Sequence, residues 1–554
     1  MTFVQDPPQP GHPWRDDPFL RGYLAHRLPP PVMAEVEPSL LEMAETAAGR
    51  LRRLLEAERG QEPVLVQWDA WGRRVDRIEL TPLWKEAARV AAEQGVVATA
   101  HERRHGELSR IHQFALVHLF EPSSDVYSCP LAMTDGAVRT LVHLGNRELC
   151  ERAVPRLTSR DPEKAWTSGQ WMTERTGGSD VATSETVARQ VDGSWRLWGT
   201  KWFTSAATSD MALTLARPEG NPPGGRGLAM FYLETHDASG GPNGILVHRL
   251  KEKLGTRKLP TAELALEGTL AVPVAGLTDG VKNITTMLNT TRTWNAVAAA
   301  AMSRRAVSLA ADYARRRSAF GAPIAEKALH AATLADMEAL AEGIFLLAFR
   351  AAELMGKEEA RTLSEEEAKL SRLVVPIAKL LTGKQAVAVA SEALEAIGGS
   401  AYVEDTGLPQ LLRDAQVLPI WEGTTNVLSL DLLRALAKER AFDVLAAEVG
   451  RRTEAAPDEA ARRAGEMARD AVAGAGAWLS AASTAGGAAL EAGARRFAMT
   501  LGLALEVALL VEHGAFTLSR SGDDAPLRAA SRLCRMGIDL VADPTAVPSV
   551  LPRR

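Results

Sequence analysis

Residues 194–203 read SWRLWGTKWF, a run of alternating apolar and polar side chains that is typical of a half-buried strand. Similar runs follow along the chain: MALTLARP, LAMFYLET, GILVHRL and AELALEGTLAV. Asp192-Gly193 lies between two such runs, and this pair is typical of a tight hairpin because glycine tolerates a positive φ. We therefore predict a small antiparallel β domain over residues 166–275.

The sequence on both sides of this β domain has a helical period, as in SLLEMAETAAGRLRRLLEAE and WNAVAAAAMSRRAVSLAADYARRR. We predict an N-terminal helical domain over 38–165, a C-terminal helical bundle over 276–440 and an additional helical extension over 441–554. Residues 1–37 are rich in proline, and we expect them to form an extended segment. The predicted fold class is α+β and multidomain, in the order helices, β domain, helices, extra helices.

The bulk composition argues against several classes of protein. The formal net charge is −5 and the isoelectric point is near 6.2, which gives no general reason to expect nucleic-acid binding. Cys129, Cys150 and Cys534 lie far apart and form no CxxC pair, which argues against a disulfide framework and a zinc site. This usage fits a reducing compartment, so we expect a cytoplasmic protein without a metal site.

No stretch of the sequence indicates a membrane protein. The N-terminal residues contain no apolar run and carry early acidic residues, so we do not expect a signal peptide. Residues 501–510 read LGLALEVALL, which is too short to span a bilayer and contains Glu506. We predict that this stretch is a buried helix and that the protein is soluble.

Five short motifs contain residue types suited to binding or catalysis. They are MTERTGGSD at 172–180, KWFTS at 201–205, RRRSAFG at 315–321, EAIGGSAY at 395–402 and PIWEGTTN at 419–426. In the first motif a glycine pair lets the backbone approach a ligand closely, although a surface turn has the same residue types. In the second motif Trp202 offers a ring for stacking on a cofactor, although most such rings fill a β core.

The other three motifs also have two readings each. The three arginines at 315–317 could grip a pyrophosphate or could complement the C-terminal end of a helix. Gly398 and Gly399 could leave room for a nucleotide or could end a helix. Glu422 could be a base or a charge at the start of the next helix. Individually the motifs do not distinguish these readings.

Together, in this order and spacing, the motifs resemble those of the acyl-CoA dehydrogenase family, from about residue 67 to residue 436. That family has TE-x-x-GGSD, KWF(T/I)S, R-x-x-FG, GG-x-x-Y and (Y/W)EGT in the same succession. The resemblance implies an α, β, α domain order, an FAD cofactor, an acyl-CoA substrate and a homo-oligomer, usually a tetramer. It also implies an electron-transfer flavoprotein or another acceptor for the electrons.

The resemblance assigns roles to individual positions. The residues expected to bind FAD are Met172, Thr173, Gly178, Ser179, Trp202, Thr204, Arg317, Phe320, Gly398, Gly399, Thr424 and Asn426. Those expected near the substrate are Ser179, Met133, Thr134, Trp421 and Gly423. Arg317, Phe320, Gly398 and Gly399 match positions that contact the FAD of a neighbouring subunit.

By the same resemblance, Glu422 is the catalytic base and Arg292 helps to position the active-site loop. Some relatives place the base on an earlier helix, but the corresponding residues 291–295 read TRTWN and contain no acid. A thioester α-C–H is only weakly acidic, so its removal requires a carboxylate whose basicity is raised by desolvation. The α,β-dehydrogenation of an acyl-CoA is therefore the predicted reaction.

The CPLAMT stretch at 129–134, the LKEKLGTRK segment, the long N-terminal segment and the extra C-terminal helices resemble the AidB branch of this family. That branch suggests an alternative function, a DNA-associated alkylation-response flavoprotein with weak dehydrogenase activity. Residues 441–554 contain 13 Arg, no Lys and 14 Asp plus Glu, so their net charge is 13 − 14 = −1. A DNA-binding surface needs concentrated positive charge, so solvated or oligomer-packing helices are the favoured reading. An acyl-CoA oxidase also remains open.

Overall fold

The computed structural model describes residues 6–439 and 441–541, which form two compact units. One unit, here called the helical unit, consists of the chain up to Ala44, His105–Leu119 and the chain from Asn295 onward. The other, here called the mixed unit, consists of Glu45–Arg104 and Phe120–Trp294. Parts of the predicted N-terminal segment, bundle and extension, namely residues 1–5, 440 and 542–554, lie outside the described residues.

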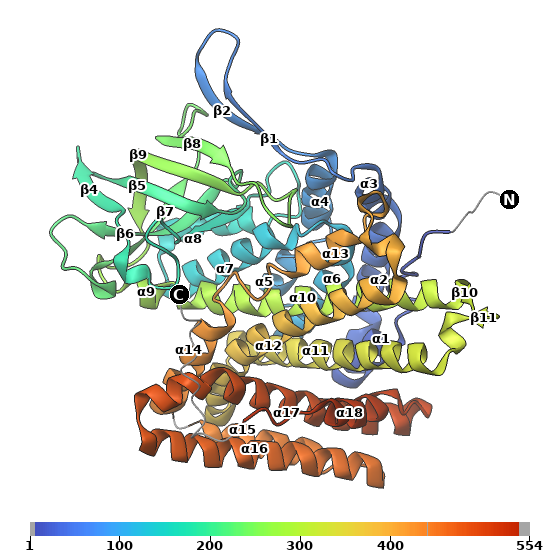
Figure 1. Cartoon of the computed structure of the whole chain (residues 1–554). Coiled ribbons are helices and arrows are strands. Elements are labelled where there is room, and N and C mark those ends of the chain that lie inside the picture. The colour runs from blue at the N-terminus through green and yellow to red at the C-terminus, as the bar shows by residue number, and fades with distance from the viewer. Residues whose placement is uncertain (1–5, 440, 542–554) are drawn as a thin grey trace, which may run out of the picture. The chain divides into compact units, whose positions relative to one another are not determined.

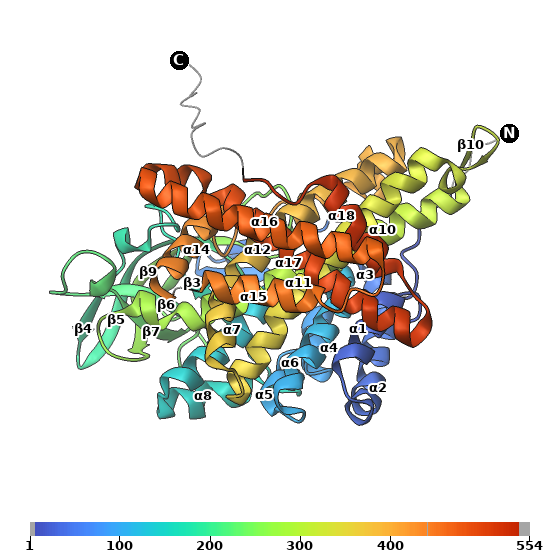
Figure 2. The same ribbon diagram turned by 90° about the horizontal axis from the view of Figure 1, so that it is seen from below.

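The helical unit is built mainly from long helices, several of which lie side by side in both Figure 1 and Figure 2. Its elements are α1 (Pro18–Arg27), α2 (Pro30–Thr46), α6 (Ser109–Phe120), β10 (Ser318–Ala319), β11 (Ala322–Pro323), α11 (Ala328–Ala360), α12 (Glu365–Ile397), α13 (Pro409–Ala415), α14 (Thr425–Glu439), α15 (Phe442–Thr453), α16 (Glu459–Ala485), α17 (Gly487–Ser521) and α18 (Ala525–Met536). Helix α10 (Thr285–Arg316) begins in the mixed unit and ends in the helical unit.

From Pro18 onward the N-terminal segment is mostly helical, so our prediction of an extended segment up to residue 37 was wrong for that part. Asp17 caps α1 by accepting a hydrogen bond from the Leu20 N–H at 3.0 Å, and Pro18 occupies the first helical turn. Proline is tolerated there because the N–H that it lacks has no partner within the helix. The same reason lets Pro30 begin α2. Proline-rich sequence therefore marked helix starts and not an extended chain.

The mixed unit combines helices with strands. Its elements are α3 (Arg52–Ala57), β1 (Val64–Trp68), β2 (Arg74–Glu79), α4 (Pro82–Glu93), α5 (Ala98–Glu102), α7 (Ser128–Leu144), α8 (Arg147–Leu157), β3 (Ser168–Trp171), β4 (Val187–Val191), β5 (Ser194–Thr204), β6 (Met211–Pro218), β7 (Ala229–Glu234), β8 (Ile245–Leu250), β9 (Ala262–Pro273) and α9 (Gly280–Asn283). Strands β3–β9 form one seven-stranded sheet with a core of small and apolar side chains. The predicted β domain is confirmed.

The sheet differs from the prediction in two respects. Most pairings are antiparallel, but β6 pairs in parallel with both β3 and β4. A second, two-stranded hairpin, β1–β2, interrupts the region that we predicted to be all helical. Its turn is closed by Asp69, whose carboxylate accepts hydrogen bonds from the backbone N–H groups of Trp71 and Arg73. The predicted hairpin at Asp192-Gly193 is confirmed, because both residues have positive φ and join β4 to β5.

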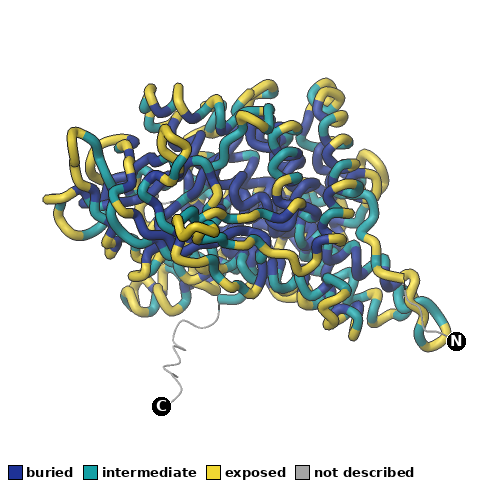
Figure 3. The backbone as a smooth tube through the Cα atoms, turned by 90° about the horizontal axis from the view of Figure 1, so that it is seen from above, coloured by how far each residue is buried: buried dark blue, intermediate teal, exposed yellow. Residues whose placement is uncertain are grey.

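Helix α17 is buried along its central part, which confirms the prediction for residues 501–510. Glu506 is fully buried there, and its carboxyl accepts a hydrogen bond from Gln385 Nε2 of α12 at 2.8 Å. By length and composition alone α12 and α17 could cross a membrane, but 83% and 78% of their most apolar windows are buried inside the protein. Figure 3, in which the chain is coloured by the burial of each residue, shows long buried stretches between exposed ones.

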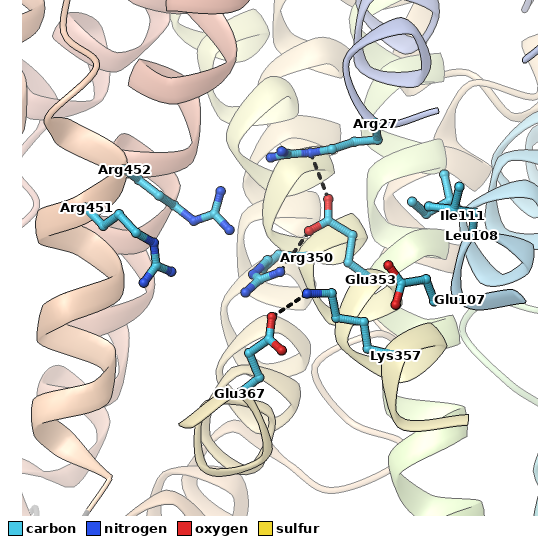
Figure 4. Close-up of a pocket in the computed structure, with 10 residues that line it drawn as sticks. All are labelled: Arg27, Glu107, Leu108, Ile111, Arg350, Glu353, Lys357, Glu367, Arg451 and Arg452. Carbon is cyan, nitrogen blue, oxygen red and sulfur yellow. Dashed lines mark hydrogen bonds and ion pairs between the residues drawn. The ribbon is translucent and has the colours of Figure 1, made fainter. Parts of the chain in front are cut away.

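A network of ion pairs joins α15 of the C-terminal extension to α11 and α1. Figure 4 shows the part of this network that joins α1 to α11. On α11, Glu353 contacts Arg27 at 3.0 Å and Arg350 at 2.9 Å. On α15, Glu448 contacts Arg350 at 3.0 Å and Arg452 at 2.7 Å. Burial disfavours the charged form of Glu353, but the two arginines outweigh it and lower the pKa of that carboxyl to about 2. Glu107 contacts the Thr362 hydroxyl, and the other charged side chains around this pocket of about 280 Å³ form ion pairs, which fasten the extension to the bundle.

Burial raises the pKa of Glu506 to about 8, well above its value in an unfolded chain, and predicts a pH-dependent stability. Between these two pKa values the native state holds a proton that the unfolded state has lost, so stability falls as pH rises. The expected slope is about 1.4 kcal/mol per pH unit. Glu506→Gln stays neutral at every pH, so its stability lacks this slope. The free energy of unfolding of the variant minus that of the wild type should therefore rise by roughly 3 kcal/mol from about pH 5 to pH 7. Urea unfolding of both proteins at the two pH values measures this difference, and an equal difference at both would contradict it.

Candidate active site

A buried ion pair joins the first two motifs in the mixed unit. Glu174 and Lys201 are 2% and 0% exposed, and the Lys201 ammonium donates to the Glu174 carboxylate at 2.7 Å. The same carboxylate accepts hydrogen bonds from the Thr186 hydroxyl at 2.6 Å and the Glu185 N–H at 2.6 Å. Lys201 also donates to the Leu215 carbonyl at 3.0 Å. Burial opposes ionisation of Glu174, but Lys201 and the hydrogen bonds outweigh it and lower the pKa of the carboxyl.

The 172–180 loop lies directly beside β5. The Trp202 N–H donates to the Thr173 carbonyl at 3.0 Å, so the backbone of the first motif pairs with the second. At Gly178 an added Cβ would lie 2.5 Å from the Thr173 hydroxyl, which explains the glycine by close packing within the loop. Met172 is buried, whereas Ser179 is exposed. The structure therefore places the loop of the first motif directly beside the strand of the second, and the expected FAD contacts of these residues stay predictions.

Two side chains of β5 fit a flat, polar ligand such as the flavin of FAD. The Thr204 hydroxyl is 1% exposed as a residue and has no hydrogen-bond partner among the described residues. A buried hydroxyl without a partner is unfavourable, so a ligand that hydrogen-bonds it would be stabilised. Trp202 is half-buried, and the Lys251 ammonium lies 3.7 Å from the centre of its ring. Trp202 and Thr204 would hold the flavin there.

In the helical unit, Glu422 lies in the turn between α13 and α14. It is half-buried and has a φ of 57°, which is uncommon for a residue with a side chain. Gly423 follows with a φ of 104°, a conformation that only glycine adopts readily. The neighbouring Trp421 donates its indole N–H to Asn295 Oδ1. Strained backbone of this kind persists where surrounding contacts impose it and is common at functional sites.

Thr424 and Asn426 are exposed at the start of α14, which begins at Thr425. The backbone N–H groups at the beginning of a helix attract anions. Asn426 Oδ1 also accepts a hydrogen bond from Arg495 of α17 at 3.5 Å. Both residues are thus placed where a phosphate or carbonyl group of a ligand could be held.

The third motif forms a tight hairpin at the end of α10. Phe320 and Gly321 both have positive φ and connect β10 to β11, so the Phe320 side chain lies at the tip and is 96% exposed. Arg317 stands at its base, where its carbonyl accepts a hydrogen bond from the Ile324 N–H at 2.8 Å. Gly398 ends α12 with a φ of 82°, and a Cβ added at Gly398 or Gly399 would touch nothing. The chain itself leaves this surface open.

The remaining predicted residues lie in helices of the mixed unit. Met133 and Thr134 are buried in α7. The Thr134 hydroxyl donates to the Pro130 carbonyl at 2.7 Å and accepts from the Ser168 N–H at 3.0 Å, so it joins α7 to β3. Arg292 is on α10, where it contacts Asn289 at 3.5 Å. The structure thus gives Thr134 a structural role, and its predicted contact with substrate stays a prediction.

Sequence reasoning missed a buried carboxylate next to these positions. Asp135 is fully buried and contacts His101 Nε2 at 2.8 Å and the indole N–H of Trp294 at 2.7 Å. It also missed the pairing of Glu174 with Lys201. A signal was present for Lys201, because a lysine at an inward position of a strand such as β5 is rarely buried without a partner, whereas Glu174 lies in the loop after β3. The partner itself could not be identified from one sequence.

Removing the charge of Glu174 should weaken FAD binding. In Glu174→Gln the Lys201 ammonium stays buried without its carboxylate, which loosens the loop that carries Thr173 and lowers stability by roughly 3 kcal/mol. We expect at least about tenfold weaker FAD binding, measured as the FAD-to-protein ratio and by titration of the apoprotein. Glu185→Gln is the matched control, because that side chain is exposed. Wild-type FAD affinity in Glu174→Gln would contradict the role of the pair.

Three models of protein families match successive parts of the chain. The acyl-CoA dehydrogenase middle domain matches residues 169–269, and the C-terminal domain of the same family matches residues 278–437. The N-terminal domain of the adaptive response protein AidB matches residues 8–164. The similarity therefore begins well before residue 67, where the motifs alone had placed its start.

Similar proteins come from an animal and a bacterium. Acyl-CoA dehydrogenase family member 11 of Caenorhabditis elegans is 43% identical over 96% of this chain and 88% of its own length. The crystal structure of that organism's ACDH-11 in complex with C11-CoA has a TM-score of 0.93, with 42% identity, and the match covers 98% of this chain and 93% of that one. The putative acyl-CoA dehydrogenase AidB of Escherichia coli is 33% identical over 69% of this chain and 71% of its own. The chain therefore belongs to the acyl-CoA dehydrogenase family, FAD-dependent oxidoreductases that act on the CH–CH bond of acyl-CoA thioesters, and within that family it is AidB-like.

Proposed function

We propose that this acyl-CoA dehydrogenase removes the α-proton of a saturated acyl-CoA with the carboxylate of Glu422. The observation that carries the proposal is the Glu422 turn, in which strained backbone presents a half-buried carboxylate between Trp421 and Gly423. A general base must be held in place and partly shielded from water, and this turn provides both. No acid stands at the alternative position on α10, where residues 291–295 read TRTWN.

The reaction balances with one base and one hydride acceptor. Glu422 takes the proton from Cα, and the electrons of that C–H bond form the Cα–Cβ double bond as Cβ loses a hydride. When bound, FAD supplies the acceptor for that hydride, and the product is a trans-2-enoyl-CoA. The Glu422 backbone N–H donates to the thioester carbonyl, where it stabilises the charge that develops as the proton leaves. Binding of the acyl chain displaces water around Glu422 and raises its basicity.

The proposed substrate is a straight-chain acyl-CoA of medium to long chain, with an acyl group of about eleven carbons. Support comes from the structure of ACDH-11 in complex with C11-CoA, which is 42% identical and covers 98% of this chain. The electrons of the reduced flavin then pass to an electron-transfer flavoprotein or to oxygen, and these are the two classes of electron acceptor in this proposal. The proposed location is the cytoplasm, a setting that suits three free cysteines of which two are buried.

We further propose that the enzyme is a homo-oligomer. Large apolar side chains of the helical unit are exposed in or near the last three motifs. They are Phe320 at 96%, Leu329 at 83%, Tyr402 at 90% and Ile420 at 60%. Exposed aromatic and other large apolar side chains are typical of interaction surfaces. In this proposal the Phe320 hairpin and the Gly398-Gly399 turn contact a neighbouring subunit and its FAD.

Binding to DNA is the second candidate, and the arginines of the extension do not favour it. Arg451 and Arg452 contact Glu448, Arg528 contacts Asp524 and Arg532 contacts Asp336. A carboxylate beside each of these four guanidinium groups lowers the local positive charge on which phosphate binding depends, and the extension as a whole has a net charge of −1. We therefore propose that the extension packs within the enzyme. Gel-shift titrations at low salt would reveal binding if this reading is wrong.

Glu422→Gln should keep its FAD but lose the reaction. The amide has the shape of the carboxylate but cannot accept the α-proton, so the rate of anaerobic flavin bleaching by an acyl-CoA series should fall at least about a hundredfold. Glu366→Gln, a change at an exposed position of α12 outside the five motifs, is the matched control and should bleach normally. If no acyl-CoA of any length or branching bleaches the wild-type flavin, the proposed function is wrong.

Charged residues at the exposed aromatic positions should break the oligomer. The double variant Phe320→Asp, Tyr402→Asp places two carboxylates on the proposed contact, where desolvation without a partner is unfavourable. Its mass by light scattering should drop below that of the wild type, with a lower FAD content. Trp71→Asp, on the exposed β1–β2 turn of the mixed unit, serves as the control. An unchanged mass for the double variant would contradict this interface.

A further inference from the structure

The turn that carries Glu422 is held on both sides by buried polar side chains from other helices. Lys379 of α12 is 0% exposed, and its ammonium donates to the Gly423 carbonyl at 2.5 Å. Asn295 of α10 is 4% exposed, and its Oδ1 accepts from the indole N–H of Trp421. Glu422 thus lies between Trp421, which is hydrogen-bonded to α10, and Gly423, which is hydrogen-bonded to α12.

Asn295 also binds the chain further back. Its Nδ2 donates to the Leu418 carbonyl at 3.3 Å, so a single amide uses its acceptor and its donor on the same turn. This bond lies four residues before Glu422. The two bonds together fix both the path of the backbone and the direction of the Trp421 ring.

Helix α12 packs directly on the same turn. A Cβ added at Gly383 would lie 3.1 Å from the Leu418 carbonyl carbon and oxygen, so the helix and the turn are in backbone contact there. Lys379 and Gly383 are four residues apart and therefore lie on one face of α12. The same face of α12 therefore contacts the backbone at Leu418 through Gly383 and binds the Gly423 carbonyl through the Lys379 ammonium.

The physical reason for these contacts is the conformation of the base. Glu422 has a φ of 57°, which an L-residue adopts only when its surroundings impose it. A hydrogen bond from an ammonium group to a carbonyl is stronger than one between neutral groups. Without Lys379 the half-buried Gly423 carbonyl would lose this donor, and the turn could relax to a common conformation.

We propose that Lys379 and Asn295 are positioning residues for Glu422, which together hold its carboxylate at the α-carbon of the acyl-CoA. Neither residue lies in one of the five motifs, and both act through the Trp421-Glu422-Gly423 backbone. The inference rests on the proposed function, because positioning has a meaning only if Glu422 is the base. It adds that residues of α10 and α12, outside the motif, fix the position of the Glu422 carboxylate.

The test compares acyl-CoA binding with the rate of the chemical step. Lys379→Met should keep FAD and should bind acyl-CoA within about twofold of wild type, while its anaerobic bleaching rate falls on the order of a hundredfold. Lys379→Arg keeps a donor and a charge, and it should recover part of that loss. Lys384→Met, which removes a partly exposed lysine from the same helix, is the matched control and should bleach normally.

Asn295 gives an independent pair of variants, should Lys379→Met fail to fold. Asn295→Asp keeps the acceptor for Trp421 and should retain more of the bleaching rate than Asn295→Leu, which loses both bonds. Wild-type bleaching rates in Lys379→Met, or in both Asn295 variants with FAD bound, would overturn the proposal. Equal losses in acyl-CoA affinity and rate would also overturn it, because they indicate general damage. Wild-type protein that no acyl-CoA bleaches would instead contradict the proposed function.

Discussion

The buried ion pair between Glu174 and Lys201 is the interaction on which the ligand-facing part of the mixed unit depends. Two charges in a protein interior are favourable only when hydrogen bonds satisfy every remaining polar atom. Thr186, the Glu185 N–H and the Leu215 carbonyl meet that condition here. As a result, two motifs that are separated along the chain lie side by side, and the Trp202 N–H is hydrogen-bonded to the Thr173 carbonyl.

The helical unit uses the same kind of constraint at two other places. At the Glu422 turn, the Lys379 ammonium and the Asn295 amide bind backbone and indole groups of a strained segment. At the C-terminal extension, Arg350 is shared between Glu353 of α11 and Glu448 of α15. In each case a polar side chain within an apolar helix face marks a contact between segments distant in sequence. Such contacts fix the relative orientation of the two segments, because a hydrogen bond depends on the direction of its groups and apolar packing does not.

The extension is part of the bundle's core and not an appended surface. Helix α17 packs against α11 and α12, and its central part is buried. The sequence indicated a buried helix at residues 501–510 from its apolar run, and Glu506 then looked like an interruption. In the structure Glu506 binds Gln385 and is held by burial in its neutral form. An ionisable residue can therefore belong to a core when its pKa shifts far enough.

The sequence by itself determined the features that depend on neighbouring residues. Alternation predicted the β domain, Asp192-Gly193 predicted its hairpin, and the five motifs indicated the family and predicted Glu422 as the base. Only the tertiary structure decided which residues meet across the chain: Glu174 with Lys201, Lys379 with Gly423, and Asp135 with Trp294. It also showed that prolines 18 and 30 begin helices. Local patterns encode backbone preference within a few residues, whereas burial and pairing depend on packing between segments that the sequence alone does not bring together.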